Sequence, residues 1–179
     1  MGLVVDAQVV KGFFQESVLC THHALSGSPA RIFDPQFRRH CIFVDPEGTI
    51  QHEWRSLVDP DWFDVWFADL MRDGSICLIA APSDVALSKA LRALGFPSGR
   101  DIWYVRVGCA VRRRLGFSIL ISEDLDFYEP KEKCCGDKRR CTILCSGAGS
   151  VRRYLRKKCG VIVRSVERFV AECPECAAV

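Results

Sequence analysis

Apolar residues along the chain form short continuous runs that alternate with segments in which they recur every three or four positions. The continuous runs are typical of strands buried on both faces of a sheet, and we expect such strands at 3–5, 41–45 and 117–121. The wider spacing is typical of amphipathic helices, which we expect over 7–20, 61–73, 83–94 and 101–115. Strands that alternate with helices predict an α/β fold with a mostly parallel central sheet and helices on both faces.

Other segments are read from weaker patterns. Residues 49–54 fit either a hairpin arm or the start of a helix, and Asp61 is expected to cap the helix that follows. Two further strands and a short basic helix are expected at 141–145, 161–163 and 151–158, respectively. Since no linker or internal repeat divides the chain, we expect one domain over 1–165 and a cysteine-containing tail over 166–179.

Acidic residues follow two of the expected strands directly. Asp6 ends the first apolar run, and Glu123, Asp124 and Asp126 come just after the run that ends at Ile121. Carboxylates are rarely buried unless they are paired or bind a metal, and open α/β sheets bind ligands at the carboxyl edge. Because Mg²⁺ and Mn²⁺ prefer oxygen ligands, these acids predict a metal site suited to phosphodiester hydrolysis.

The two acidic strand ends resemble motifs of the PIN-domain nucleases. The first is Leu3-Val4-Val5-Asp6, an apolar strand that ends in Asp. The second is Ile119 to Phe127, in which Ser122-Glu123-Asp124-Leu125-Asp126-Phe127 follows the strand. The resemblance implies a compact three-layer α/β/α sandwich that binds Mg²⁺ or Mn²⁺ and cleaves RNA as an endoribonuclease.

The resemblance also implies two further acids between these motifs. Glu53 fits the first of them best, with Asp45, Asp64 and Asp69 as alternatives, and Asp101 fits the second. The family helix that follows the second acid usually carries small residues, whereas this chain has Trp103 and Tyr104 there.

Each acid then receives an expected role. Asp6, Asp101 and Asp124 would hold the main metal ion, and Glu53 and Asp126 would hold a second ion or position the attacking water. Ser122 could hydrogen-bond an acid or simply end the strand, and we favour the second interpretation. Glu123 alternates to the opposite face of an extended segment, so it is expected to point away from the site.

Charge and composition add candidate contacts to substrate. The 179 residues are 49% hydrophobic and 26% charged with a formal net charge of +3, which is typical of a globular protein. Local basic clusters could contact the phosphates of RNA. They contribute the candidate substrate-binding residues Arg112, Arg113, Lys138, Arg139 and Arg140.

Eleven cysteines, an odd number, accompany an N-terminus without the features of a signal peptide. We therefore expect a reducing, cytoplasmic environment with free thiols rather than a disulfide framework. Cys173-Pro174-Glu175-Cys176 has the spacing of zinc ligands, but no second such motif exists, so free thiols are favoured over a structural Zn²⁺ site. No apolar stretch is long enough for a membrane span.

Two biological interpretations remain open at this point. Small PIN domains resemble the toxins of toxin–antitoxin pairs, which implies an antitoxin protein as partner and a homodimer. The substrate would be RNA, or single-stranded DNA. The alternative is a catalytically inactive PIN-like domain that binds RNA or a protein.

Overall fold

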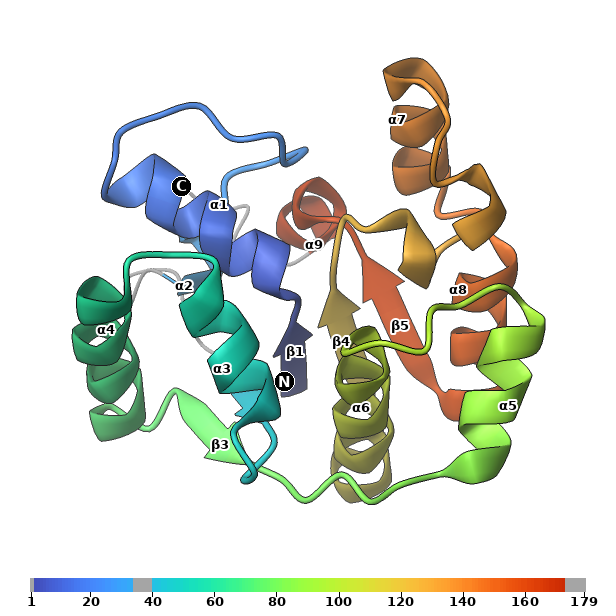
Figure 1. Cartoon of the computed structure of the whole chain (residues 1–179), viewed down its shortest axis with the longest axis horizontal. Helices are drawn as coiled ribbons and strands as arrows, with labels where there is room; N and C mark the ends of the chain where they lie inside the picture. The colour runs from blue at the N-terminus through green and yellow to red at the C-terminus, as the bar shows by residue number, and fades with distance from the viewer. Residues whose placement is uncertain (1, 34–39, 173–179) are drawn as a thin grey trace.

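The computed structural model describes residues 2–33 and 40–172, which form a single parallel sheet with helices around it (Figure 1). The sheet order is β3-β2-β1-β4-β5, and each pair of neighbouring strands is parallel. The strands are β1 (Gly2–Val5), β2 (Cys41–Val44), β3 (Ile76–Leu78), β4 (Ser118–Ile121) and β5 (Val161–Arg164). The predicted α/β class with a parallel sheet is confirmed.

The helices account for most of the remaining described chain. They are α1 (Ala7–Ser17), α2 (Ala30–Phe33), α3 (Thr49–Ser56), α4 (Pro60–Arg72), α5 (Val85–Ala93), α6 (Asp101–Leu115), α7 (Asp137–Ser146), α8 (Ser150–Tyr154) and α9 (Val166–Glu172). Short helical turns add η1 (Leu125–Phe127), η2 (Pro130–Glu132) and η3 (Leu155–Cys159). Among these described helices, none has the length and apolar character that crossing a membrane would require.

Hydrophobic burial fixes the middle of the sheet. All four residues of β1 are buried, as are most of those in β2 and β4, which is the pattern of strands covered on both faces. Helix α6 packs across β1, β2, β4 and β5. In Figure 1, α1 to α4 lie on the left of the central strands, and α5, α7 and α8 lie on the right.

The strand order reverses between β1 and β4. The chain builds β1, β2 and β3 outward in one direction and then returns to place β4 and β5 on the other side of β1. In open parallel sheets, ligands bind at the carboxyl edge beside such a reversal, because the loops there diverge and leave a crevice. The sheet topology therefore marks the carboxyl ends of β1 and β4 as the first place to look for a functional site.

Two helical segments differ from the sequence-based expectations. Residues 141–145 lie within helix α7 rather than in a strand. Only Ile143 and Leu144 of this run are buried, whereas Cys141 and Cys145 are exposed, so the run could not fill a strand covered on both faces. Gly147, at a φ of 62°, ends the helix in the left-handed conformation that glycine adopts readily.

The start of α4 also differs. Asp59, not Asp61, caps this helix, because its Oδ1 accepts a 2.8 Å hydrogen bond from the Trp62 amide. Pro60 occupies the first helical position, where its fixed φ and missing amide hydrogen are tolerated. Of the two alternatives for residues 49–54, the structure shows the helix, α3.

The domain continues beyond the expected boundary at residue 165. Helix α9 buries Val166 and Phe169 in the same core as the sheet, and the Phe169 ring lies 5.5 Å from the ring of His40, which precedes β2. Part of the expected tail over 166–179 is thus an integral helix. The Cys173–Cys176 motif lies outside the described residues.

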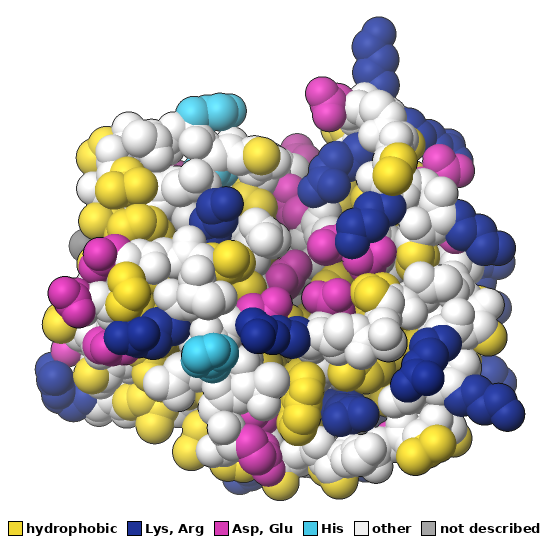
Figure 2. All heavy atoms as spheres, viewed as in Figure 1, with side chains coloured by type: hydrophobic (Ala, Val, Ile, Leu, Met, Phe, Trp, Pro, Cys, Tyr) yellow, Lys and Arg dark blue, Asp and Glu magenta, His cyan; other side chains and the backbone are white. Residues whose placement is uncertain are grey.

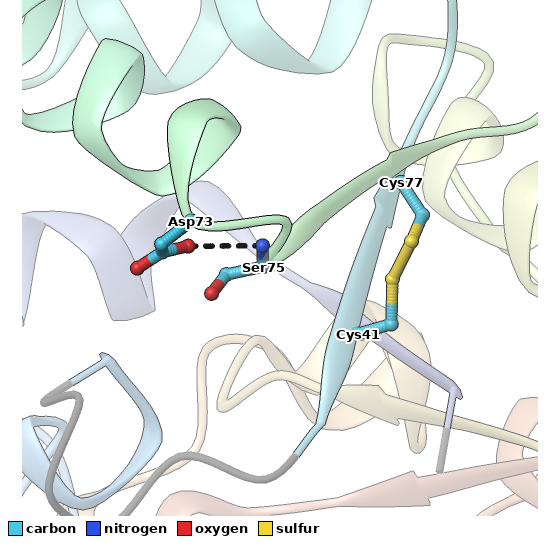
Figure 3. The surroundings of a disulfide bond; sticks show 4 residues. All are labelled: Cys41, Asp73, Ser75 and Cys77. Atoms are coloured by element: carbon cyan, nitrogen blue, oxygen red, sulfur yellow. Dashed lines mark hydrogen bonds between the residues drawn. A yellow bond between two sulfur atoms is a disulfide. The ribbon is translucent and has the colours of Figure 1, made fainter.

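A disulfide joins the edge strand β3 to its neighbour β2 (Figure 3). In the parallel register Cys77 pairs with Phe43, so Cys41, two residues earlier than Phe43, is a diagonal neighbour of Cys77 on the same face. The Cα atoms of Cys41 and Cys77 are 6.1 Å apart. The expectation that the cysteines are free thiols is therefore wrong for this pair. It holds for the other described cysteines, which are Cys20, Cys109, Cys134, Cys135, Cys141, Cys145 and Cys159.

Candidate functional site

The carboxyl ends of β1 and β4 place Asp6 beside Ser122. Parallel pairing matches Val5 with Ile121, so the next residue of each strand stands at the same edge of the sheet. The Asp6 amide donates to the Ile121 carbonyl at 2.9 Å, and the Ser122 hydroxyl donates to Asp6 Oδ2 at 2.5 Å. The interpretation of Ser122 as a mere strand end is wrong, because its hydroxyl fixes one carboxylate oxygen of Asp6.

Ser122 also shapes the loop that carries Asp124. Its Oγ accepts a hydrogen bond from the Asp124 amide at 3.0 Å, and Asp124 Oδ1 accepts one from the Asp126 amide at 2.9 Å. Asp124 thereby caps the short turn η1, which the chain enters directly from the strand. Because the Ser122 hydroxyl also donates to Asp6, these bonds connect the acidic loop to Asp6.

Helices α3 and α6 bring two further acids to the same place. Asp101 is the first residue of α6, and Glu53 lies in α3. The buried hydroxyl of Tyr104 in α6 donates to Glu53 Oε2 at 3.0 Å and so connects the two helices. The indole of Trp54 donates to the Val5 carbonyl at 3.1 Å, which fixes α3 against the end of β1.

The fifth predicted acid, Asp126, meets a lysine. Asp126 is buried, and Lys133 Nζ, from the segment after η2, forms an ion pair with Asp126 Oδ2. The same Nζ lies 3.9 Å from Asp124 Oδ1. Lys133 therefore places a positive charge at one side of the acidic cluster.

Burial and mutual repulsion raise the proton affinity of two of these acids. The pKa of Asp6 rises to about 7, chiefly because the carboxyl is buried; the Ser122 hydrogen bond opposes the rise, and the negative charges of Asp124 and Asp101 add to it. The pKa of Asp101 rises to about 6, again mainly through burial, with Asp124, Glu53 and Asp126 contributing and Lys133 opposing. The five acids thus act on one another across a shared site.

We call this cluster of Asp6, Glu53, Asp101, Asp124 and Asp126 the acid site. Figure 2 shows acidic side chains gathered in a hollow at the middle of the viewed face, with Lys and Arg side chains around it. Five carboxyl groups with one lysine leave an excess of negative charge, and carboxylate oxygens are the donors that Mg²⁺ and Mn²⁺ prefer. The donor chemistry fits a divalent cation.

The acids have suitable donor atoms, but their side chains are not spaced to enclose an ion. Across residues 2–33 and 40–172, no three Asp, Glu, His or Cys side chains are grouped closely enough to enclose an ion as they stand. Several carboxylates are instead held by protein donors, namely those of Ser122, Tyr104 and Lys133. Side chains would have to turn toward a cation for it to be held by three of them.

Glu123 points away from the acid site and has a structural role. Its carboxylate accepts hydrogen bonds from the Ser26 amide at 2.8 and 2.9 Å, and from the Ser26 hydroxyl. It also accepts one from the Val166 amide at 3.2 Å, at the start of α9. Glu123 therefore fixes the loop after α1 and the last described helix to the end of β4.

The alternatives to Glu53 lie elsewhere. Asp45 is buried and accepts hydrogen bonds from the amides of Thr49 and Ile50 at 2.7 and 2.8 Å, so its carboxylate supports the start of α3. Asp64 and Asp69 are exposed on α4, where they pair with Arg55 and Arg72. Of the four candidates for this acid, the structure brings Glu53 to the acid site.

The predicted basic residues fall into two groups. Arg112 and Arg113 lie in the last turn of α6, whereas Asp101 opens this helix, so about 16 Å of helix separates them from the acid site. In the second group, Arg140 donates to the Glu123 carbonyl at 2.6 Å and Arg139 pairs with Glu132 at 3.3 Å. Together with exposed Lys138, they lie on α7 near the acidic loop.

Tyr104 and Lys133 are contacts of the acid site that the sequence did not single out. Helical periodicity could have placed Tyr104 on the inner face of α6, since it lies three residues after Asp101. Its partner Glu53 is 51 positions away, however, and no local pattern joins them. Lys133 lies in a charged loop without periodicity, so no local signal identifies its partners.

Comparison of the chain with protein-family models, with curated proteins and with solved structures finds no match. The functional conclusion therefore depends on the fold, the acid site and the chemistry of the side chains.

Proposed function

We propose that the protein is a Mg²⁺- or Mn²⁺-dependent nuclease that hydrolyses RNA phosphodiester bonds, with a PIN-like α/β/α fold. One observation carries the proposal: five acids, from the end of β1, from α3 and α6 and from the loop after β4, lie around the point where the strand order reverses. This is where parallel sheets bind ligands. So many carboxylates with little compensating positive charge are costly unless they serve a cation.

Some residues of the acid site would bind the cation, and others orient the side chains that do so. Asp6, Asp101 and Asp124 would hold the main cation, and Glu53 and Asp126 line the same space. A bound Mg²⁺ or Mn²⁺ would supply Lewis acidity to the scissile phosphate and a stronger nucleophile from water. Ser122 binds one oxygen of Asp6, and the other oxygen accepts only a 3.4 Å hydrogen bond from the Gln8 amide, which a cation could replace. Tyr104 likewise binds one oxygen of Glu53.

The electrostatics favour cation binding near neutral pH. Burial and neighbouring carboxylates destabilise the charged forms of Asp6 and Asp101, raising their pKa values. A divalent cation would shift the protonation equilibrium of both acids the other way, because it favours deprotonated carboxylates and releases their protons. Binding should therefore strengthen as pH rises through the range in which Asp6 and Asp101 ionise.

The test is cleavage of an unstructured RNA in the presence of Mg²⁺ or Mn²⁺, with a chelator as the metal-free control. Asp6→Asn and Asp124→Asn should each reduce the rate by at least about a hundredfold, because each removes a charge from the site. Asp64→Asn is the matched control, since this acid is exposed and pairs with Arg55. Absence of cleavage of RNA and of single-stranded DNA, or cleavage unaffected by both site variants, would overturn the proposal.

An inactive PIN-like domain that binds RNA or a protein predicts a different result. In that case RNA binding would be measurable without turnover, and it would persist in Asp6→Asn. An antitoxin partner and a homodimer also remain proposals; co-purification with a small partner protein and sedimentation of the isolated chain would test them separately.

A further inference from the structure

A groove runs between α5 and α6, and it is made of three adjoining cavities. Their volumes are about 220, 350 and 50 Å³. Arg106 lines all three cavities. The 220 and 350 Å³ cavities also share Ser83 and Val85, and the 350 and 50 Å³ cavities share Ser88 and Arg92. We call this continuous feature the α5–α6 groove.

Helical spacing explains why these residues line one groove. On α6 the lining residues are Ile102, Arg106, Cys109 and Arg113, and spacings of four, three and four place them on one face. On α5 they include Ser88, Lys89 and Arg92, which likewise share a face. The groove therefore follows α6 along most of its length, about 16 Å from Ile102 to Arg113.

The groove is strongly basic. Four of its lining residues are Lys or Arg, and Asp84 is the one acid among them. The Asp84 carboxylate already accepts a 2.8 Å hydrogen bond from the Leu87 amide as the cap of α5. Within the described part of the chain, Lys89, Arg92, Arg106 and Arg113 form no ion pair. Figure 2 shows basic side chains over the region that α5 and α6 occupy in Figure 1.

Arg106 is the central residue of the groove. Its guanidinium lies 5.1 Å from the centre of the Trp103 ring, a cation–π contact that fixes its position. Its buried Nε has no hydrogen-bond partner among the described residues. A buried N–H group without a partner is costly unless a ligand accepts its hydrogen bond, and the rest of the half-buried guanidinium offers four further donors to the same ligand.

The groove leads to the acid site. The smallest of its three cavities is lined by Phe96, Ser98 and Ile102, among others, and Ile102 directly follows Asp101 in the first turn of α6. A chain held in the groove would thus leave it beside an acid that lines the acid site. Arg113, which lies far from the acids, lines the opposite end of the groove.

We propose that the α5–α6 groove binds the phosphate backbone of a single-stranded nucleic acid and guides it to Asp101. Lys and Arg side chains would neutralise successive phosphates, and the serine hydroxyls would add hydrogen bonds. Basic grooves beside an aromatic ring, here the partly exposed Trp103, suit single strands. This inference rests on the proposed function, since it assigns the substrate path for the same acid site.

The experiment measures binding of a labelled, unstructured RNA by fluorescence anisotropy in a chelator, so that cleavage does not interfere. Lys89→Glu/Arg92→Glu changes two exposed side chains of α5. It should weaken binding by about tenfold or more and lower the slope of log K against log salt concentration by about 1.4, or 0.7 for each lost contact. Arg106→Gln, which keeps most of the side-chain stem, should weaken binding in the same direction.

A matched control separates the groove from general charge. Arg156→Glu/Lys157→Glu causes the same change in net charge at a different basic cavity and should change affinity by less than about threefold. Equal losses in the two double variants, no loss in either, no RNA binding by the wild type, or equal competition by poly-glutamate would overturn the groove assignment.

The outcome also separates this inference from the proposed function. If the wild type cleaves RNA but the groove variants bind it normally, the groove assignment falls and the nuclease stands. If the expected binding losses occur without any metal-dependent cleavage, the nuclease proposal falls and the groove stands as a nucleic-acid-binding surface.

Discussion

Ser122 Oγ donates a 2.5 Å hydrogen bond to Asp6 Oδ2, which joins the ends of two neighbouring strands across 116 positions of sequence. The hydrogen bond favours the ionised form of the Asp6 carboxyl, whereas burial of the same group favours its neutral form. It also leaves the other Asp6 oxygen to a weak 3.4 Å contact with the Gln8 amide. Ser122 is therefore a positioning residue whose effect should be visible in the titration of Asp6.

Ser122→Ala should raise the pKa of Asp6 above its present value of about 7, because it removes the hydrogen bond that favours the carboxylate. Mn²⁺ affinity near neutral pH should fall by about 3- to 30-fold, and the pH dependence of binding should move to higher pH. Calorimetry at several pH values would show both effects. Ser118→Ala is the control, since Ser118 begins β4, the strand that Ser122 follows, and its buried hydroxyl has no hydrogen-bond partner among the described residues. Equal behaviour of the two variants would contradict this role.

The metal-free protein should lose stability as pH rises. Asp6 has a pKa of about 7 in the folded protein, against 3.8 for an ordinary Asp, so the folded state holds this proton more tightly than the unfolded state does. Its contribution is fully present below about pH 4 and is lost as pH rises through about 7. Asp6→Asn removes the ionisation, so its free energy of unfolding should exceed that of the wild type by about 1–3 kcal/mol near pH 8.

Urea unfolding in a chelator, at about pH 5 and about pH 8, measures this difference. Asp64→Asn serves as the control, because Asp64 is exposed on α4. The prediction fails if the wild type and Asp6→Asn show the same change in stability between the two pH values.

Lys133 should compete with a divalent cation for the acids. Its ammonium group pairs with Asp126 and lies 3.9 Å from Asp124, so it neutralises charge that a metal ion would otherwise meet. Lys133→Gln should increase Mn²⁺ affinity by about 3- to 10-fold, since a close positive charge opposes cation binding. Lys131→Gln is matched to it, because Lys131 is exposed in the same segment and forms no ion pair among the described residues. Unchanged or weaker affinity in Lys133→Gln would exclude competition.

The disulfide between Cys41 and Cys77 should stabilise the outer part of the sheet. It closes a loop with a sequence separation of 36 between β2 and β3, so its loss should lower the free energy of unfolding by about 2–4 kcal/mol. Cys41→Ala/Cys77→Ala and reduction of the wild type should have similar effects on the melting temperature. The control is Cys141→Ala/Cys145→Ala, which changes two exposed thiols 3.7 Å apart on α7. Equal melting temperatures for oxidised and reduced wild type would refute the stabilisation.

Local sequence patterns predicted much of this architecture. The buried strand ending at Val5 and the helix over 101–115 are present, because continuous burial and helical periodicity both leave clear traces in a sequence. The prediction of a strand at 141–145 was wrong. This run of mainly cysteine and aliphatic residues resembles a buried strand, but it forms part of α7 and only its middle is buried. Short apolar runs leave this ambiguity, which the tertiary context resolves.

The candidate site was predictable only in part. Asp6 and Asp124 follow strands and could be placed at one sheet edge from topology alone. Glu53 could be placed only after the chain was folded, because its link to Tyr104 joins two helices that no sequence pattern pairs. The contacts of Lys133 come from a segment without periodicity, so its side-chain direction has no signature in the sequence.

The position of β1 beside β4 has a consequence for synthesis of the protein. β1 is synthesised more than a hundred residues before Ser122, its partner at the acid site. Glu123 moreover takes a hydrogen bond from Val166, so the loop after β4 is fully supported only once α9 has formed. A nascent chain therefore lacks a complete acid site until α9 has been synthesised, and under the proposed function this delay would protect the messenger and ribosome that produce the protein.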